Sequence, residues 1–352
     1  MVVGAVGVIA VLVTGCVALP GLRRPDIATF SERFTLPPAN DASSVRVRFG
    51  GVSTLLFEVD GAPALMTDGF FSRPGLGAIL TAKIGPDAAA ISYGLGQMDV
   101  EAVPLIVPLH AHYDHAMDAP WVALKTGARL LGDASIRNIA RGSPLAETRV
   151  DTVTPGKPVV FGEWTLTFIP AEHAPTRFRL PGEITKALRP PARVSEWREG
   201  QPWTLFVEHA PGTHRAKSFL VHASAGYRPG EIARALAGRC VDIVFLGVGG
   251  AGHQRSSERE RLWTETVRAA NASRVILIHW DDLFQGLDQP LRPMSYVTDN
   301  FARTIEHFER LAAADGRDLR LPPVFDLFDP YSDLPAQREP CYGSTLTGAH
   351  RD

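Results

Sequence analysis

The sequence has no excess of charge of either sign. Thirty-six Lys and Arg residues stand against 38 Asp and Glu residues in a chain of 352, so the formal net charge is −2, and no block of like charge stands out. A dedicated nucleic-acid-binding protein carries a basic footprint that neutralises phosphates. We therefore expect no nucleic-acid partner and no charged, solvated tail.

Cysteine is scarce. The chain has three cysteines, at positions 16, 240 and 341, and none forms a CxxC pair. This spacing excludes a zinc knuckle and a CxxC redox pair. We expect Cys240 to be an inert buried thiol, with a disulfide between Cys240 and Cys341 as the alternative in an oxidising compartment.

Charge is absent from the first 22 residues. Residues 2–13 are all aliphatic or glycine, and the run ends in Leu-Val-Thr-Gly-Cys at 12–16, which resembles a bacterial lipobox. In that interpretation 1–22 is a lipoprotein signal, Cys16 carries a lipid anchor, and the folded part lies outside the cytoplasm. A signal peptide has a Lys or Arg before its apolar run, and this sequence has none there. The alternative is an uncleaved membrane helix. Both interpretations attach the protein to a membrane.

The remaining chain reads as one domain with additions. Residues 23–43 are rich in proline and polar residues and predict a linker. We expect the folded domain to span 44–325. Within it, 175–202 is a proline- and charge-rich insertion, interpreted as a lid over a site. Residues 326–352 form a polar C-terminal tail that we expect to wrap the surface.

Short strands alternate with helices in both halves of the domain. The predicted strands are 45–49, 54–59, 64–66, 103–109, 164–169, 204–208, 219–222, 243–246 and 275–278. Asp118 is expected to cap a helix over 119–125. Phe301, Ile305, Phe308 and Leu311 have helical spacing typical of a core-facing stripe. No short-period repeat is visible, and two similar halves favour an α/β fold, a four-layer αββα sandwich.

One segment carries the chemistry: His110-Ala111-His112-Tyr113-Asp114-His115, directly after an apolar strand. Three imidazoles and a carboxylate within six residues are hard to explain structurally. The imidazoles would repel one another when protonated, and each would need its own partner when buried neutral. A divalent cation resolves this, because neutral imidazole and carboxylate are ligands that zinc prefers. In an extended loop His110 and His112 point the same way and are placed to bind one ion.

The HxHxDH pattern at 110–115 resembles the signature of the metallo-β-lactamase superfamily. The segment Thr-Asp-Gly-Phe-Phe-Ser-Arg at 67–73 is similar to the TDPFFSR segment of the branch that contains ascorbate-phosphate lactonases and N-acyl-phosphatidylethanolamine phospholipase D, with Gly69 in place of its proline. The resemblance covers roughly residues 45–290. It independently implies the four-layer sandwich.

The resemblance implies two metal positions. The first is held by three histidines and the second by one aspartate and two histidines: His110, His112 and His173, then Asp114, His115 and His279. Asp114 and His115 are also the expected catalytic residues, because Asp114 is placed to orient a water or shuttle its proton. Asp68 is expected to fix a ligand histidine from behind. We expect one or two zinc ions, with Mn²⁺ or Fe²⁺ as alternatives.

The chain departs from the family where a bridging aspartate is expected. Ser224 stands at that position, and serine is a poor metal ligand. The second ion is then weakly held or absent, unless another group replaces the aspartate. His222 is the first candidate, and Asp281 and Asp282 are further ones. The 247–252 loop matches GxGxxG, which alone is weak evidence, and is interpreted as a site rim with His253 as a substrate contact.

These residues predict a metal-dependent hydrolase of a phosphodiester, lactone or related ester, with a small-molecule or lipid-like substrate. A nuclease on the same fold is an alternative that the neutral charge balance disfavours. The alternative from another class is a binding protein that kept the fold and lost catalysis, and Ser224 is the feature that favours it.

Overall fold

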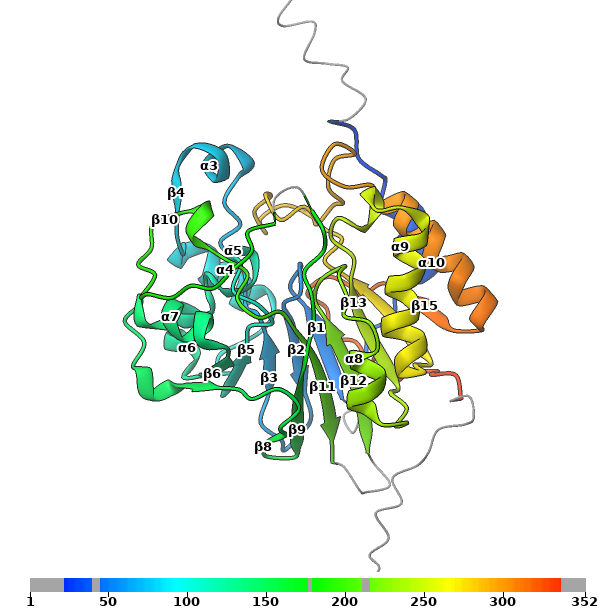
Figure 1. The fold of residues 1–352 in the computed structure, drawn as a ribbon. Helices are drawn as coiled ribbons and strands as arrows, with labels where there is room; N and C mark the ends of the chain where they lie inside the picture. Colours follow the sequence, from blue (N-terminus) through cyan, green and yellow to red (C-terminus); the bar gives the residue numbers. More distant parts are fainter. Residues whose placement is uncertain (1–21, 40–44, 177–178, 211–215, 337–352) are drawn as a thin grey trace, which may run out of the picture.

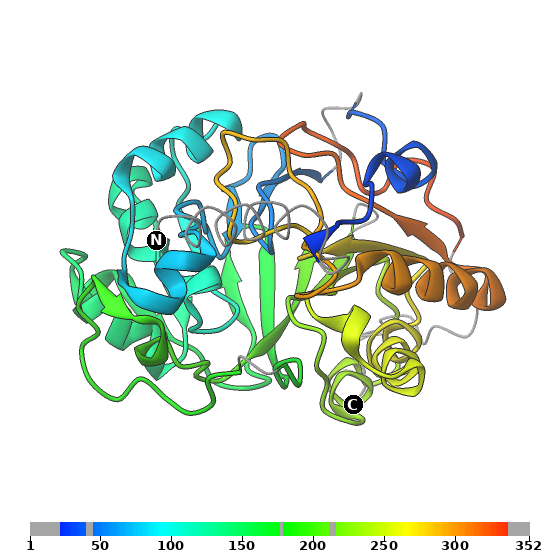
Figure 2. The same cartoon turned by 90° about the horizontal axis from the view of Figure 1, so that it is seen from above.

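The computed structural model describes residues 22–39, 45–176, 179–210 and 216–336. Two β-sheets face one another in the middle of the molecule, and helices cover their outer faces (Figure 1; Figure 2 shows the same layers from above). Four-layer packing places the first-half helices from residue 76 onward beside one sheet and the last three helices beside the other. The helix at Ala28–Phe34 lies with the last three helices, and the ring centroid of its Phe30 is 5.9 Å from that of Phe301. The predicted four-layer αββα sandwich is confirmed.

The first sheet has six strands in the order β1-β2-β3-β5-β6-β7. Its antiparallel part is β1, β2 and β3, and its parallel part runs from β3 through β5 and β6 to β7. The bounds are β1 Arg46–Phe49, β2 Leu55–Glu58, β3 Leu65–Thr67, β5 Leu105–Val107, β6 Arg129–Gly132 and β7 Val150–Thr152. Every residue of β5 is buried, as expected for a parallel strand covered on both faces.

The second sheet has seven strands in the order β15-β14-β13-β12-β11-β9-β8. The bounds are β8 Val159–Phe161, β9 Trp164–Pro170, β11 Trp203–His209, β12 Lys217–His222, β13 Ile243–Gly247, β14 Arg274–Ile278 and β15 Asp318–Arg320. Strand β11 is antiparallel to both β9 and β12, so β9 runs in the same direction as β12, β13 and β14. The loops that follow β9, β13 and β14 therefore leave the sheet at one edge.

The α-helices are α2 Ala28–Phe34, α3 Leu76–Thr81, α4 Ala88–Gln97, α5 Tyr113–Ala116, α6 Ala119–Thr126, α7 Ala134–Arg141, α8 Glu231–Leu236, α9 Ser256–Trp263 and α10 Phe301–Asp315. Shorter turns are the 3-10 helices η2 Glu147–Arg149, η3 Val194–Glu196 and η4 Ala251–His253, and the π-helix η5 Thr264–Arg268. None of the described helices is long and apolar enough to cross a membrane.

Helix α10 follows from its sequence. Asn300 caps it by accepting a hydrogen bond from the amide of Arg303, and Gly316 ends it in a left-handed conformation. The stripe predicted from spacing is buried at Phe301, Ile305 and Phe308. The core between the sheets is aromatic: Phe57 of β2 stacks on Phe219 of β12 with ring centroids 4.3 Å apart.

The expected linker is more ordered than its composition indicates. Helix α2 lies inside it, and its Phe30 and Phe34 are buried. Thr35 forms a β-bridge with Leu321, and Pro38 forms one with Phe328 of the expected tail. Phe328 is fully buried, so the described part of the tail also packs on the domain rather than only wrapping the surface. The proline content of both segments predicted irregular structure. A single β-bridge needs few backbone N–H donors, so these segments pair with the domain despite their prolines.

The insertion at 175–202 has its own small core. Its Ile184, Leu188 and Trp197 are buried in a cluster with Ile79 of α3 and Ile136 of α7. Its short strand β10 (Ala192–Arg193) pairs with β4 (Lys83–Ile84) outside the two main sheets.

The cysteines give one correction. Cys240 is disulfide-bonded, so the expectation of a free buried thiol is wrong. Cys16, with its expected lipid, and Cys341 lie outside the described residues.

Candidate metal centre

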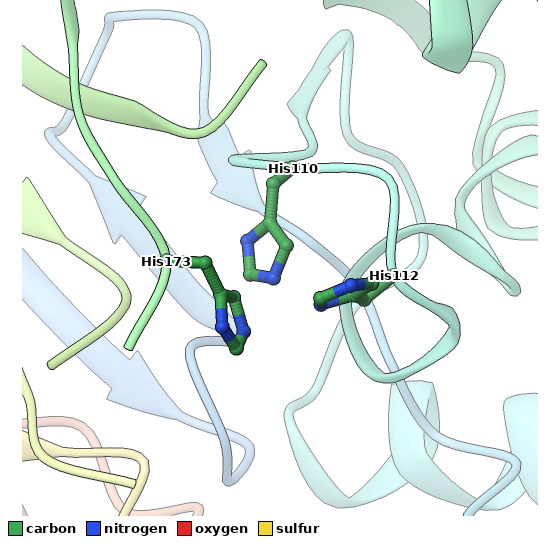
Figure 3. A group of neighbouring side chains, drawn as sticks. All are labelled: His110, His112 and His173. Atoms are coloured by element: carbon green, nitrogen blue, oxygen red, sulfur yellow. The ribbon is translucent and has the colours of Figure 1, made fainter. Parts of the chain in front are cut away.

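Three loops bring the predicted ligands together. His110 follows β5, His173 follows β9 and His279 follows β14. Figure 3 shows the imidazoles of His110, His112 and His173 gathered around one point, with ring centroids 4.5 to 5.1 Å apart. One ligand atom from each of the three lies within 4.8 Å of the others. The helix α5 begins only at Tyr113, so His110 and His112 lie on the extended loop before it.

Asp114, His115 and His279 form the second group, with their ligand atoms again within 4.8 Å of one another. Oδ2 of Asp114 lies 3.5 Å from Nε2 of His115 and 3.4 Å from Nε2 of His279. The two groups adjoin, because the ring centroids of His110 and His115 are 3.7 Å apart. The structure thus brings together all six residues that the resemblance implies as ligands.

Backbone carbonyls decide which ring nitrogens carry protons. Nδ1 of His173 donates to the carbonyl of Ala174 over 2.9 Å, and Nε2 of His112 to the carbonyl of Leu180 over 3.4 Å. A carbonyl can only accept, so each bonded nitrogen holds the proton and the opposite nitrogen holds a lone pair. Leu180 belongs to the insertion, which therefore touches the site through His112.

The electrostatics keep these groups in their ligand forms. Burial, reinforced by neighbouring imidazoles, lowers the pKa of His110 well below its ordinary value of 6.5 and that of His173 to about 3. Burial alone would raise the pKa of Asp114, but the imidazoles of His115 and His279 outweigh it and hold that pKa well below its ordinary value. At neutral pH the imidazoles of His110 and His173 are therefore uncharged and can donate a lone pair to a metal ion, and Asp114 is ionised.

Asp68 supports His115 from behind. Its Oδ2 lies 2.7 Å from Nδ1 of His115, and its Oδ1 accepts a hydrogen bond from the amide of Leu109 over 2.8 Å. Both side chains are fully buried. Burial lowers the pKa of His115, but the carboxylates of Asp68 and Asp114 outweigh it and raise that pKa. With Nδ1 bonded to Asp68, Nε2 of His115 faces the cluster.

His279 is held by backbone contacts and by a buried ion pair. Its φ of 57° is unusual for a residue with a side chain, and its amide donates to the carbonyl of Val52 over 2.7 Å. The amide of Val52 donates in turn to Asp281, and Asp281 pairs with Arg73 over 2.7 Å, both side chains being fully buried. A Cβ at Gly249 would lie 2.6 Å from Nδ1 of His279, so only glycine fits there.

Asp118 binds the 67–73 segment, although its position before a helix predicts a helix cap. It occupies the N-cap position of α6, but its side chain makes no capping bond. Instead its carboxylate accepts hydrogen bonds from the amides of Phe71 and Ser72 and from the hydroxyl of Ser72, at 2.6 to 2.7 Å. The expected capping bond is therefore wrong. The carboxylate ties the 67–73 segment to the helix that follows the histidine cluster.

The candidate substitutes for the missing aspartate are engaged elsewhere. His222 bonds Thr204 through Nδ1 and the carbonyl of Gly226 through Nε2, both at 2.6 Å, and burial lowers its pKa to about 4. The hydroxyl of Ser224 accepts from the amide of Ala174 over 2.8 Å and so steadies the loop of His173. Asp281 is committed to Arg73.

His253 is exposed at the end of η4 and lies outside both ligand groups. Its loop is held by Asp299, which accepts hydrogen bonds from the amides of Gly250 and Gly252.

The residues present fit a divalent cation. Nε2 of His110 and Nε2 of His115 are buried without a hydrogen-bond partner among the described residues. Leaving such groups unpaired costs free energy unless something else contacts them. Five imidazoles and one carboxylate in two adjoining triads are the donor set of a zinc-, manganese- or iron-binding site.

The structure is similar to solved structures, although no protein-family model matches the chain and no curated protein matches its sequence. Igni18, a metallo hydrolase from Ignicoccus hospitalis, has 16% identity and a TM-score of 0.50 over 81% of this chain and 99% of that chain. YhfI, a metallo-β-lactamase fold protein from Bacillus subtilis, has 13% identity and a TM-score of 0.47 over 81% of this chain and 99% of that chain. CmlA, a diiron β-hydroxylase from Streptomyces venezuelae, has 14% identity and a TM-score of 0.47 over 82% of this chain and 54% of that chain. This chain adopts the metallo-β-lactamase fold, with two adjoining histidine- and aspartate-rich groups at one edge of its sheets.

Proposed function

We propose that this protein is a metal-dependent hydrolase of a phosphodiester, lactone or related ester. The observation that carries the proposal is the convergence of six ligand-type side chains from three loops. Three of their ring nitrogens, Nε2 of His110, Nε2 of His115 and Nδ1 of His279, are buried with no hydrogen-bond partner among the described residues. A structural role would leave these groups without compensation, whereas a catalytic metal site uses them.

A divalent cation bound there would act as a Lewis acid and lower the pKa of water toward about 7. The chain supplies the groups around it. Asp114 is ionised and accepts a proton or orients the attacking water through its carboxylate. Asp68 holds His115 in the tautomer that presents Nε2 to the cluster. His112 and His173 are oriented by the carbonyls to which they donate.

Ser224 supports the expectation of unequal metal affinities. Its hydroxyl accepts a hydrogen bond from the amide of Ala174, and both ring nitrogens of His222 are hydrogen-bonded. Neither side chain therefore replaces the missing aspartate as a ligand between the two groups. We propose one tightly held ion at His110, His112 and His173. A second, weaker ion would be held at Asp114, His115 and His279.

The substrate class rests on the 67–73 segment and on charge. The segment resembles the lactonase and phospholipase branch, and Asp118 fixes it beside the histidine cluster. The formal net charge of −2 disfavours a nuclease.

The test is metal stoichiometry of the full chain by elemental analysis, after growth and after reconstitution with zinc, manganese or iron. We expect one to two equivalents in the wild type and a loss in His112→Ala. The exposed His253→Ala is the matched control and should keep its metal. A panel of phosphodiesters and lactones then tests turnover. A wild-type protein without metal would refute the hydrolase and favour a binding protein on this fold.

We also propose that the apolar stretch at 1–22 holds the protein at a membrane. The intact mass of the membrane-bound chain distinguishes the two anchors. A mass without residues 1–15 and with a lipid on Cys16 supports lipidation, and a mass that includes residues 1–22 without lipid supports an uncleaved helix. A wild-type chain found free of membranes would refute both.

A further inference from the structure

A cavity of about 430 Å³ opens next to the segment that follows the ligand His279. It lies between the first described residues, the start of α3 and the 282–298 loop. Its lining residues are Arg24, Leu76, Asp282, Phe284, Gln285, Gly286, Arg292, Ser295 and Thr298. Arg24 is a fixed part of this wall, because it donates to Asp282 over 2.7 Å and to the carbonyl of Pro293 over 2.8 Å.

The cavity is continuous with the structure that supports the metal ligands. Asp282 follows His279 by three residues, and its carbonyl accepts a hydrogen bond from buried Arg73 over 3.2 Å. One wall of the cavity therefore belongs to the same loop as the ligand His279.

Exposed apolar side chains gather around this cavity. Among the described residues seven large apolar side chains are exposed, and four of them belong to its three wall segments. We call these four the apolar rim: Leu22, Leu76, Leu80 and Val297, with exposed fractions of 57, 42, 65 and 65%. Leu80 lies one helical turn beyond Leu76 on α3, and Val297 lies between the lining residues Ser295 and Thr298.

The wall segments also lie together in space. The amide of Tyr296 donates to the carbonyl of Arg23 over 2.9 Å, which places Leu22 next to Val297 in the fold. Gly75, at the start of α3, approaches the carbonyl of Phe284. Figures 1 and 2 show α3 and this loop on the same end of the molecule. Clustered exposed apolar side chains of this kind mark a docking surface.

We propose that the apolar rim docks on the surface of a lipid bilayer, so that the cavity opens toward the membrane. The chain enters the described structure at Leu22, directly after the apolar stretch at 1–21. If the proposed anchor at 1–22 resides in the bilayer, the residues joined to it are held close to the membrane surface. Three basic and three acidic residues balance in segments 22–26, 76–81 and 282–298, so apolar contact rather than charge drives the docking.

The experiment uses the full chain in phosphatidylcholine vesicles that carry a photoactivatable phosphatidylcholine with its diazirine near the headgroup. After irradiation, mass spectrometry maps the lipid adducts. We expect adducts on the peptides that contain residues 76–81 and 295–298 at roughly ten-fold the level found at Val160. Val160 is the internal reference, because it is 72% exposed and lies on β8 at the opposite end of the molecule (Figure 1).

The test variant and its control both replace exposed apolar side chains by glutamate. Leu80→Glu with Val297→Glu should lower the adducts on the rim peptides roughly five-fold, whereas Val160→Glu should leave them unchanged. Metal content serves as the check of folding and should be equal in all three proteins. Equal labelling of the rim and Val160, or labelling that survives the double substitution, would overturn the proposal. The readout needs no turnover, so it is separate from the test of hydrolysis.

Discussion

Asp68→Asn is the substitution that most directly tests how the site is held. The wild-type carboxylate accepts two hydrogen bonds, one from Nδ1 of His115 and one from the amide of Leu109. Asparagine has one accepting oxygen and one donating NH₂. If the oxygen keeps the bond to Leu109, the NH₂ faces Nδ1, which must then accept. The imidazole proton moves to Nε2, and the lone pair that faces the cluster is lost.

The other orientation of the amide is no better. If its oxygen accepts from Nδ1 of His115, its NH₂ faces the amide of Leu109, and two donors meet in a fully buried place. Loss of such a supporting group lowers metal affinity by about 10- to 100-fold. That corresponds to roughly 1.4 to 2.7 kcal/mol at the site that contains His115.

The assay is a competition titration of the metal-free protein with a chromophoric chelator. We expect the weaker of two binding constants to fall by one to two powers of ten in Asp68→Asn. Asp133→Asn is the matched control, because Asp133 also accepts two backbone bonds, from Ile136 and Gln201, but contacts no ligand histidine in those bonds. Binding within about two-fold of the wild type would refute the tautomer argument.

Three other perturbations have defined outcomes. In Gly249→Ala the new Cβ meets Nδ1 of His279 at 2.6 Å, so elemental analysis should show loss of the second ion, whereas Gly96→Ala, with nothing within 4 Å, should keep it. Arg73→Met leaves Asp281 as an unpaired buried charge and should lower the free energy of unfolding by about 3–5 kcal/mol in urea titrations; a loss under about 1 kcal/mol would contradict the ion pair's role. The pKa of His222 is about 4 in the fold against an ordinary 6.5, so its stabilising contribution is complete above pH 6.5 and is lost as the pH falls through 4. The loss is about 3 kcal/mol, and a pH series of urea titrations should show a shallower dependence in His222→Gln than in wild type.

The layers and the local part of the site were accessible from the sequence. Strand periodicity and helix spacing predict the sandwich because they reflect burial, which repeats along the chain. His110, His112, Asp114 and His115 are predictable as a group because they are adjacent in sequence. His173 and His279 are 58 and 164 residues farther along than His115, and only the resemblance to a known family joined them to it.

Contacts between distant segments were not predictable. Arg73 and Asp281 look like ordinary surface charges in the sequence, and only the fold buries them together. Asp118 precedes a helix, which favours a cap, but the 67–73 segment presents two amides and a hydroxyl that compete for its carboxylate. His222 was a reasonable metal ligand until Thr204, on the neighbouring strand β11, accounted for one of its nitrogens.

The attachment of the first described residues to the cavity wall has a practical consequence. Arg24 is fastened to Asp282 and Pro293, and Arg23 to Tyr296, so the chain upstream of Leu22 begins beside the opening at a fixed place. An affinity tag or fusion partner joined directly before Leu22, in place of the apolar stretch, would stand at the entrance and obstruct bulky substrates. Low turnover of such a fusion would report the tag rather than the candidate site, and screening for activity should begin with untagged protein.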